Sequence, residues 1–124
     1  MTTTAQKPQT IQKHDIDANG KSLGRVASEA AKALMGKMSP SYTPNILSIV
    51  KVTITNAGKL NFSEKKLTQK VYTTYTQYPG GLKHATLAQL NAKNADLALR
   101  RAIERMMPRN TFRTPRMKNL TINQ

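Results

Sequence analysis

The segment 22–36 constrains the fold more than any other part of this sequence. Its apolar residues recur at the i, i+3, i+4, i+7 spacing of a helix that buries one face. They are Leu23, Val26, Ala27, Ala30, Ala31, Leu34 and Met35. Ser22 can cap the first turn, and Gly36 fits a left-handed cap at the other end. We therefore expect an amphipathic helix whose small alanines let it lie close against a sheet.

Segments that favour strands flank this helix. Residues 10–17 alternate around Ile11 and Ile16, and residues 47–55 are rich in β-branched side chains. A strand, a helix and a second strand in this order normally give a right-handed crossover with the two strands parallel. The first half of the chain therefore predicts a parallel sheet with a helix packed on it.

The second half continues the same alternation of strands and helices. A basic stretch at 65–78 favours a strand, and a short last strand is expected at 119–122. Helices are expected at 86–93 and 96–107, capped by Thr86 and Asp96, with Pro108 breaking the second one. Asn110 could start another short helix. The order of elements indicates an α/β sandwich.

The length of 124 residues fits one domain. We expect residues 1–9 to form a flexible arm and residues 10–124 a single domain with a basic C-terminal segment. Cysteine is absent, which excludes disulfides and cysteine-based zinc sites. No apolar run approaches the ~18 residues of a membrane span, and the start lacks the apolar core of a secretory signal. A cytoplasmic protein without membrane contact is expected.

The charge of the chain indicates its class of partner. Twenty Lys and Arg stand against six Asp and Glu, a formal net charge of +14. Six of the seven arginines lie within residues 100–116. A domain this basic repels itself and needs a polyanion to neutralise it, which points to RNA or DNA.

Tyrosines interleaved with lysines form the first candidate binding surface. Tyr72, Tyr75 and Tyr78 can stack on bases or sugars while the preceding lysines meet phosphates. Strand alternation would put Tyr72 and Tyr78 on one face and Tyr75 on the other, unless one or two of them pack into the core. Gly80-Gly81 is either a tight turn or a bare backbone that an RNA phosphate approaches closely.

Arginines supply the second candidate surface. Arg101, Arg105 and Arg109 are four residues apart and form either a solvated helix face or a phosphate-binding stripe. The high net charge, with only Glu104 nearby for pairing, favours phosphate contact. The sequence after them forms an irregular basic segment that is expected to order on RNA. The full set of candidate RNA-binding residues is Arg25, Lys37, Lys65, Lys66, Lys70, Tyr72, Tyr75, Tyr78, Gly80, Gly81, Lys83, Arg101, Arg105, Arg109, Arg113, Arg116 and Lys118.

Enzymatic and DNA-binding alternatives have weaker support. Asp15 and Asp17 would share a strand face, but no nucleophile, metal cluster or phosphate loop accompanies them. His14 and His84 are isolated and lack the spacing of metal ligands. We expect no catalytic residue, metal or cofactor. A DNA-binding protein would share the charge, but neither a helix-turn-helix nor a dimer zipper is evident.

Several segments together resemble the L-thirteen family of large-ribosomal-subunit proteins, in its bacterial form. The resemblance covers residues 11–122, and the Leu-Gly-Arg start of the first helix joined to Tyr-Pro-Gly-Gly-Leu-Lys is its most specific part. The segments in order are Asp17–Ser28, Gly36-Lys37, Tyr42-Thr-Pro44, Thr55-Asn-Ala57, Lys65-Lys66, Lys70-Val-Tyr72, Tyr78–Lys83 and Met106-Met-Pro-Arg-Asn110. The chain departs from the family pattern at 45–48, 61–64, 73–77 and 111–118.

This resemblance implies a fold and a role. The implied fold is a three-layer α/β/α sandwich around a mostly parallel four-stranded sheet, with basic extensions. The implied role is structural, in the large subunit of the ribosome, with binding to large-subunit ribosomal RNA and to neighbouring ribosomal proteins. Some members also bind their own messenger RNA, so messenger RNA is a further possible partner.

Overall fold

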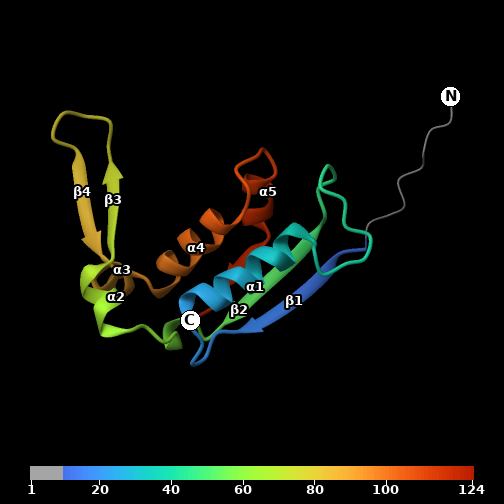
Figure 1. Cartoon of the computed structure of the whole chain (residues 1–124), viewed down its shortest axis with the longest axis horizontal. Helices are drawn as coiled ribbons and strands as arrows, with labels where there is room; N and C mark the ends of the chain where they lie inside the picture. The colour runs from blue at the N-terminus through green and yellow to red at the C-terminus, as the bar shows by residue number, and fades with distance from the viewer. Residues whose placement is uncertain (1–9) are drawn as a thin grey trace.

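The computed structural model describes residues 10–124, and the arm expected at residues 1–9 lies outside the described residues. A sheet with helices packed on it occupies one end of the described chain, and a β-hairpin projects at the other (Figure 1). The elements are β1 (Gln12–Asp17), α1 (Leu23–Met35), β2 (Val50–Thr55), the 3-10 turn η1 (Ala57–Lys59), α2 (Glu64–Gln69), β3 (Val71–Tyr75), β4 (Leu82–Thr86), α3 (Leu87–Lys93), α4 (Ala95–Met106), α5 (Arg113–Lys118) and β5 (Leu120–Ile122).

The sheet contains three strands in the order β1-β2-β5. All six residues of β1 pair in parallel with β2, and three residues of β2 pair in parallel with β5. Ile16 lies beside Ile54, which in turn lies beside Ile122, so apolar side chains line up across one face. The parallel strand–helix–strand unit and the last strand predicted from the sequence are confirmed.

The end of α1 determines where β2 begins. Ser48 Oγ donates a hydrogen bond to the carbonyl of Met35 at 3.2 Å. This bond connects Ser48 to the end of the helix rather than to the sheet. Gly36 has a φ of 81°, the left-handed cap that the sequence predicts. A Cβ at Gly36 would also collide with the Ser48 side chain. The ladder therefore starts at Val50, three residues later than the predicted strand.

Of the three side-chain caps predicted at helix N-termini, only that of Thr86 forms its hydrogen bond. Thr86 accepts from the Gln89 amide, and the Gln89 side chain accepts from the Thr86 amide, which completes a capping box for α3. Ser22 occupies the N-cap position of α1, as predicted, but its side chain accepts no capping hydrogen bond. The prediction for Asp96 is wrong, because α4 begins one residue earlier, after Asn94.

Two groups of buried apolar residues stabilise the molecule. The larger, here the sheet cluster, joins the sheet to α1 and to Leu99, Ile103 and Met107 in and after α4. The smaller, here the hairpin cluster, contains Tyr72, Leu87, Leu90 and Ala98. Phe62 is partly buried and packs against both clusters. Helix α4 also contributes to both, so it holds the hairpin end of the molecule to the sheet end.

The basic stretch at 65–78 is not one strand, as the sequence suggested. Its first part is α2, where Ser63 Oγ accepts from the Lys66 amide and Glu64 lies in the first turn. Only residues 71–75 form a strand, which pairs antiparallel with β4 in a separate two-stranded hairpin. The α/β class and the parallel sheet are confirmed, but the sheet has three strands instead of four.

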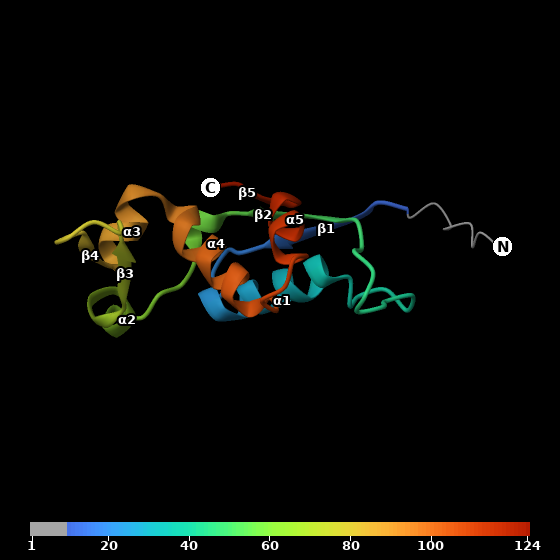
Figure 2. The same cartoon turned by 90° about the horizontal axis from the view of Figure 1, so that it is seen from above.

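The number of layers also differs from the expectation. Helices α1 and α4 lie on the same side of the sheet (Figure 2). On the opposite side of the strands, Lys13, Asp15, Asp17 and Lys51 are exposed. Within residues 10–124 the sheet therefore has one covered face and one open, polar face, so two layers replace the expected three.

Candidate nucleic-acid interface

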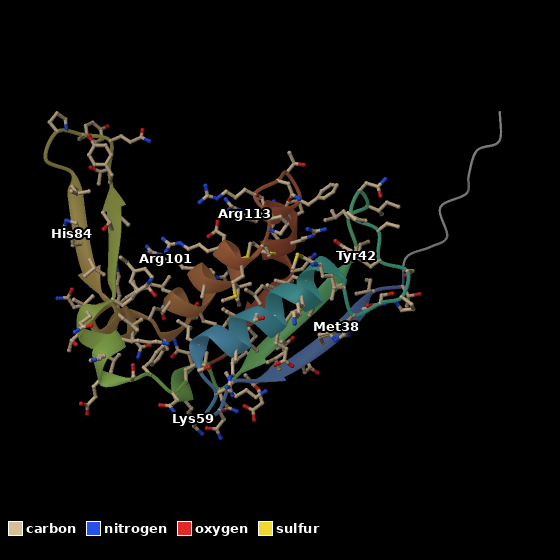
Figure 3. All side chains as sticks on the ribbon, in the orientation of Figure 1. Met38, Tyr42, Lys59, His84, Arg101 and Arg113 are labelled. Atoms are coloured by element: carbon tan, nitrogen blue, oxygen red, sulfur yellow. The ribbon has the colours of Figure 1, made fainter. Side chains whose placement is uncertain are left out.

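A groove opens where three distant segments of the chain meet. It encloses about 330 Å³ between the first turn of α1, the α2–β3 segment and α4. Figure 3 shows the Arg101 side chain reaching from α4 toward the hairpin. The groove, here called the cationic groove, is lined by Leu23, Gly24, Lys66, Lys70, Tyr72, Leu87, Arg101, Ala102, Arg105 and Met106.

The lining combines four cations with no carboxylate. Two of the cations lie over one aromatic ring: Lys70 Nζ is 5.8 Å and the Arg101 guanidinium carbon 5.4 Å from the centroid of Tyr72. A ring holds a cation through its quadrupole and leaves the net charge in place, whereas a carboxylate would cancel it. The groove is therefore a preformed, strongly positive site.

Ion pairs elsewhere do not weaken this charge. Within residues 10–124 there are two salt bridges, Lys21–Glu29 at 3.7 Å and Arg113–Glu104 at 3.9 Å. Neither involves a cation of the groove. The Arg113 pair is partly exposed and so contributes little stability. The carboxylate of Glu104 does offset the charge of Arg113, which the sequence analysis assigned to RNA binding.

The structure contradicts the role predicted for Tyr72. Its residue is 6% exposed and packs in the hairpin cluster, so the ring has little surface on which a base could stack. Tyr75 and Tyr78 are 59% and 74% exposed and keep that capacity. The predicted shared face of Tyr72 and Tyr78 is also wrong, because β3 ends at Tyr75 and Tyr78 lies in the turn.

The glycines of the hairpin turn have different roles. Gly80 has a φ of 73° and open space around it, so it fits the predicted bare backbone. Gly81 is buried, and a Cβ there would collide with the Thr76 side chain and the Tyr78 carbonyl. Gly81 therefore permits the tight turn and does not offer backbone to a phosphate.

The arginine stripe is shorter than expected. Arg101 and Arg105 lie on α4 and line the groove, but the helix ends at Met106, so Arg109 follows in an exposed loop. Arg116 is only 3% exposed, its guanidinium carbon lies 5.4 Å from the Phe112 ring, and its Nε has no hydrogen-bond partner. This burial contradicts a role for Arg116 as a surface phosphate ligand.

The remaining candidates are exposed and separate from the groove lining. Lys65 lies on α2 and Lys83 on β4 of the hairpin. At the other end, Arg25 is on the exposed side of α1, Lys37 follows its cap, and Lys118 ends α5. These exposed side chains extend the positively charged surface beyond the groove, but they do not converge on a second site.

Sequence reasoning missed the apolar side of the groove and the role of Gly24. A glycine in the first turn of a helix is a poor helix former, and that mismatch is the signal that could have identified it. A Cβ at Gly24 would meet no atom within 4 Å. The missing side chain therefore leaves room beside the groove rather than permitting an unusual backbone.

Asp17, at the end of β1, has a structural role. Asp17 Oδ1 accepts from Asn56 Nδ2 at 2.8 Å and from the Asn19 amide at 3.0 Å, which joins the ends of β1 and β2. The hydrogen bond from Asn56, followed by that from Asn19, lowers the pKa of Asp17 from its usual value. In the described part of the chain, no group of three or more His, Asp or Glu could hold a metal.

Comparison with known proteins identifies the family of the chain. The family model described as ribosomal protein L13 matches residues 11–124. The chain belongs to the ribosomal protein L13 family. The resemblance seen in the sequence is therefore confirmed. Because this family is structural and non-enzymatic, the expectation that the chain is not an enzyme is confirmed as well.

Curated relatives extend along almost the whole chain. The large ribosomal subunit protein uL13 of Thermotoga petrophila is 40% identical over 122 residues, 97% of this chain and 82% of the relative. That of Listeria welshimeri is 40% identical over 123 residues, 98% of this chain and 85% of the relative. The protein of the same name from Alcanivorax borkumensis is 36% identical over 124 residues, 98% of this chain and 87% of the relative. Among residues 10–124, no helix is long and apolar enough to cross a membrane.

Proposed function

We propose that this chain is a structural component of the large ribosomal subunit that binds large-subunit ribosomal RNA and helps it fold. The observation that carries the proposal is the cationic groove, where four cations converge without a carboxylate. The names of the relatives, each a large ribosomal subunit protein, support the same role. Its partners are then ribosomal RNA and neighbouring ribosomal proteins, in cytoplasmic ribosomes.

The exposed residues suit recognition of folded RNA. Arginine can hold two phosphate oxygens in a planar fork, and lysine neutralises phosphates more diffusely. Tyr75 and Tyr78 offer exposed rings on which unstacked bases can lie. Recognition of RNA shape is expected, because the major groove of an A-form helix is too narrow for side chains. Binding of messenger RNA by the same surfaces is a secondary proposal.

Salt dependence tests the proposed mechanism. If the chain neutralises about 6–8 phosphates of a ribosomal RNA fragment, log affinity against log salt has a slope of about −5 or steeper. A near-zero slope would contradict the mechanism. If the chain bound duplex DNA and the ribosomal RNA fragment with equal affinity at ~150 mM salt, binding would depend only on the charge of the nucleic-acid backbone and not on recognition of RNA.

A matched pair of variants locates the phosphate contacts. Lys66→Gln with Lys70→Gln removes two cations of the groove, and the salt slope should fall in magnitude by about 2. Lys13→Gln with Lys51→Gln removes the same charge from the open face of the sheet and should leave the slope nearly unchanged. Equal effects of the two pairs would mean that the charge acts without a preferred site.

A further inference from the structure

The cationic groove has two chemically different walls. Lys66, Lys70, Arg101 and Arg105 supply positive charge. Leu23, Leu87, Ala102 and Met106 supply apolar surface, and Gly24 also lines the groove. A site for bare phosphate ions needs no apolar wall, whereas a nucleotide presents both an anionic phosphate and a flat apolar base. The lining therefore matches a nucleotide better than a phosphate ion.

The size of the groove limits what can enter. Its volume of about 330 Å³ lies at the lower end of the range for small-molecule sites. A single nucleotide fits this range, but a stacked or paired segment of RNA does not. The volume therefore favours a single nucleotide that has left its helical stack.

The groove is also held open before any ligand arrives. Tyr72 is fixed in the hairpin cluster, and its ring keeps Lys70 and Arg101 in position. Gly24 has an ordinary helical backbone, so alanine would form this turn of helix better. Because Gly24 leaves open space where a side chain would lie, we infer that this glycine gives a ligand access to the groove.

We propose that the cationic groove takes one unstacked nucleotide of the bound RNA. Its phosphate lies against the cations of α2, the α2–β3 connection and α4, and its base or ribose lies against the apolar wall. This inference rests on the proposed RNA-binding function and specifies how part of that binding occurs. The remaining contacts, at the hairpin and the exposed basic residues, are with the RNA surface.

A charge placed inside the groove tests the inference in the full chain. Met106→Glu puts a carboxylate among the four cations, and Met106 is 45% exposed, so the fold should tolerate it. Met38→Glu makes the same change of charge at a residue that is 51% exposed and does not line the groove. Figure 3 shows Met38 at the far end of α1 from Arg101.

Binding of a ribosomal RNA fragment by the two variants gives the first readout. Met106→Glu should lose about 10-fold more affinity than Met38→Glu, the size of one charge-assisted hydrogen bond, with similar thermal midpoints. Equal losses overturn the groove inference while leaving the proposed function standing. A wild-type chain that does not bind ribosomal RNA overturns the proposed function itself.

Small ligands give a second readout that does not depend on the RNA fold. Uridine 5′-monophosphate titrated into the wild-type chain at low salt should shift the amide signals of Gly24, Leu87 and Ala102. Ribose 5-phosphate lacks the base and should bind several-fold more weakly. Equal affinity of the two ligands, or shifts spread evenly over basic residues elsewhere, would show that the groove does not recognise a nucleotide.

Discussion

The sheet cluster contains eighteen buried residues, most of them from the sheet, α1 and α4, whereas the hairpin cluster contains four. The cations of the groove lie beside the smaller cluster. Arg101, Lys66 and Lys70 gather beside the small cluster, and two of them are held by its only aromatic residue. The large cluster thus supplies the stability of the fold, and the small one positions cations that repel one another.

This division has a physical reason. Cations brought together without carboxylates destabilise the state that gathers them, until a polyanion arrives. We expect a small cluster attached to a larger one to tolerate that repulsion, because a hairpin can open locally without unfolding the sheet. Helix α4 couples the two, since Leu99 and Ile103 enter the sheet cluster and Ala98 enters the hairpin cluster.

The largest expected effect is on the sheet cluster. Leu34 is 1% exposed, and Leu34→Ala should lower the free energy of unfolding by about 4 kcal/mol through lost contacts and a residual cavity. Urea unfolding would measure this. RNA affinity should be nearly unchanged well below the midpoint, because the groove does not contain Leu34. A large loss of RNA affinity in the folded variant would contradict the claim that the sheet cluster serves stability and not RNA binding.

Removing the arginines should strongly weaken RNA binding while changing the stability of the fold only slightly. Arg101, Arg105 and Arg109 together replaced by alanine should weaken binding to a ribosomal RNA fragment by about 100-fold at low salt. The thermal midpoint should fall only slightly, through loss of the Arg101 contact with Tyr72. Melting of the whole fold would instead assign these residues a structural role.

The hairpin cluster should respond more weakly and more locally. Leu90 is 8% exposed, and Leu90→Ala should cost about 2 kcal/mol, at the low end for such a substitution. Hydrogen exchange should accelerate at β3 and β4 more than at β2, because the hairpin opens separately from the sheet. Uniform acceleration across all strands would mean that the two clusters unfold as one unit.

The smallest expected effect is at Asp17, on the open face of the sheet. Its pKa is lowered in the folded state, chiefly by the hydrogen bond from Asn56, so its stabilising contribution is present above the unfolded pKa of about 3.9. That contribution is lost as the pH falls through the folded pKa. The thermal midpoint of Asp17→Ala should lie slightly below wild type at pH 7, and the gap should close as the pH falls below the folded pKa. A gap that widens on acidification would contradict this role.

Regular local patterns were predictable from the sequence. The helical spacing and Gly36 located α1 well, and Thr86 located the start of α3. The stretch 65–78 was misread because its Val, Thr and Tyr residues favour strands, while the cap at Ser63 and the first-turn Glu64 favour a helix before them.

The groove could be predicted only in part. Its cations were identified as basic residues, but their convergence depends on the packing of α1, α2 and α4. Tyr72 looked like Tyr75 in the sequence, and only the position of the hairpin cluster separates the buried ring from the exposed one. Arg116 likewise looked like a surface cation until packing placed it against Phe112.

Hydrogen exchange of the full chain with and without a ribosomal RNA fragment tests the central claim most directly. RNA bound at the cationic groove should slow exchange in the first turn of α1, in α2 and in β3, and should stabilise the hairpin cluster. Exchange in β1 and β2 should change little. Protection concentrated on β1 and β2, with none around Gly24 and Lys70, would show that the RNA lies on the open face of the sheet instead.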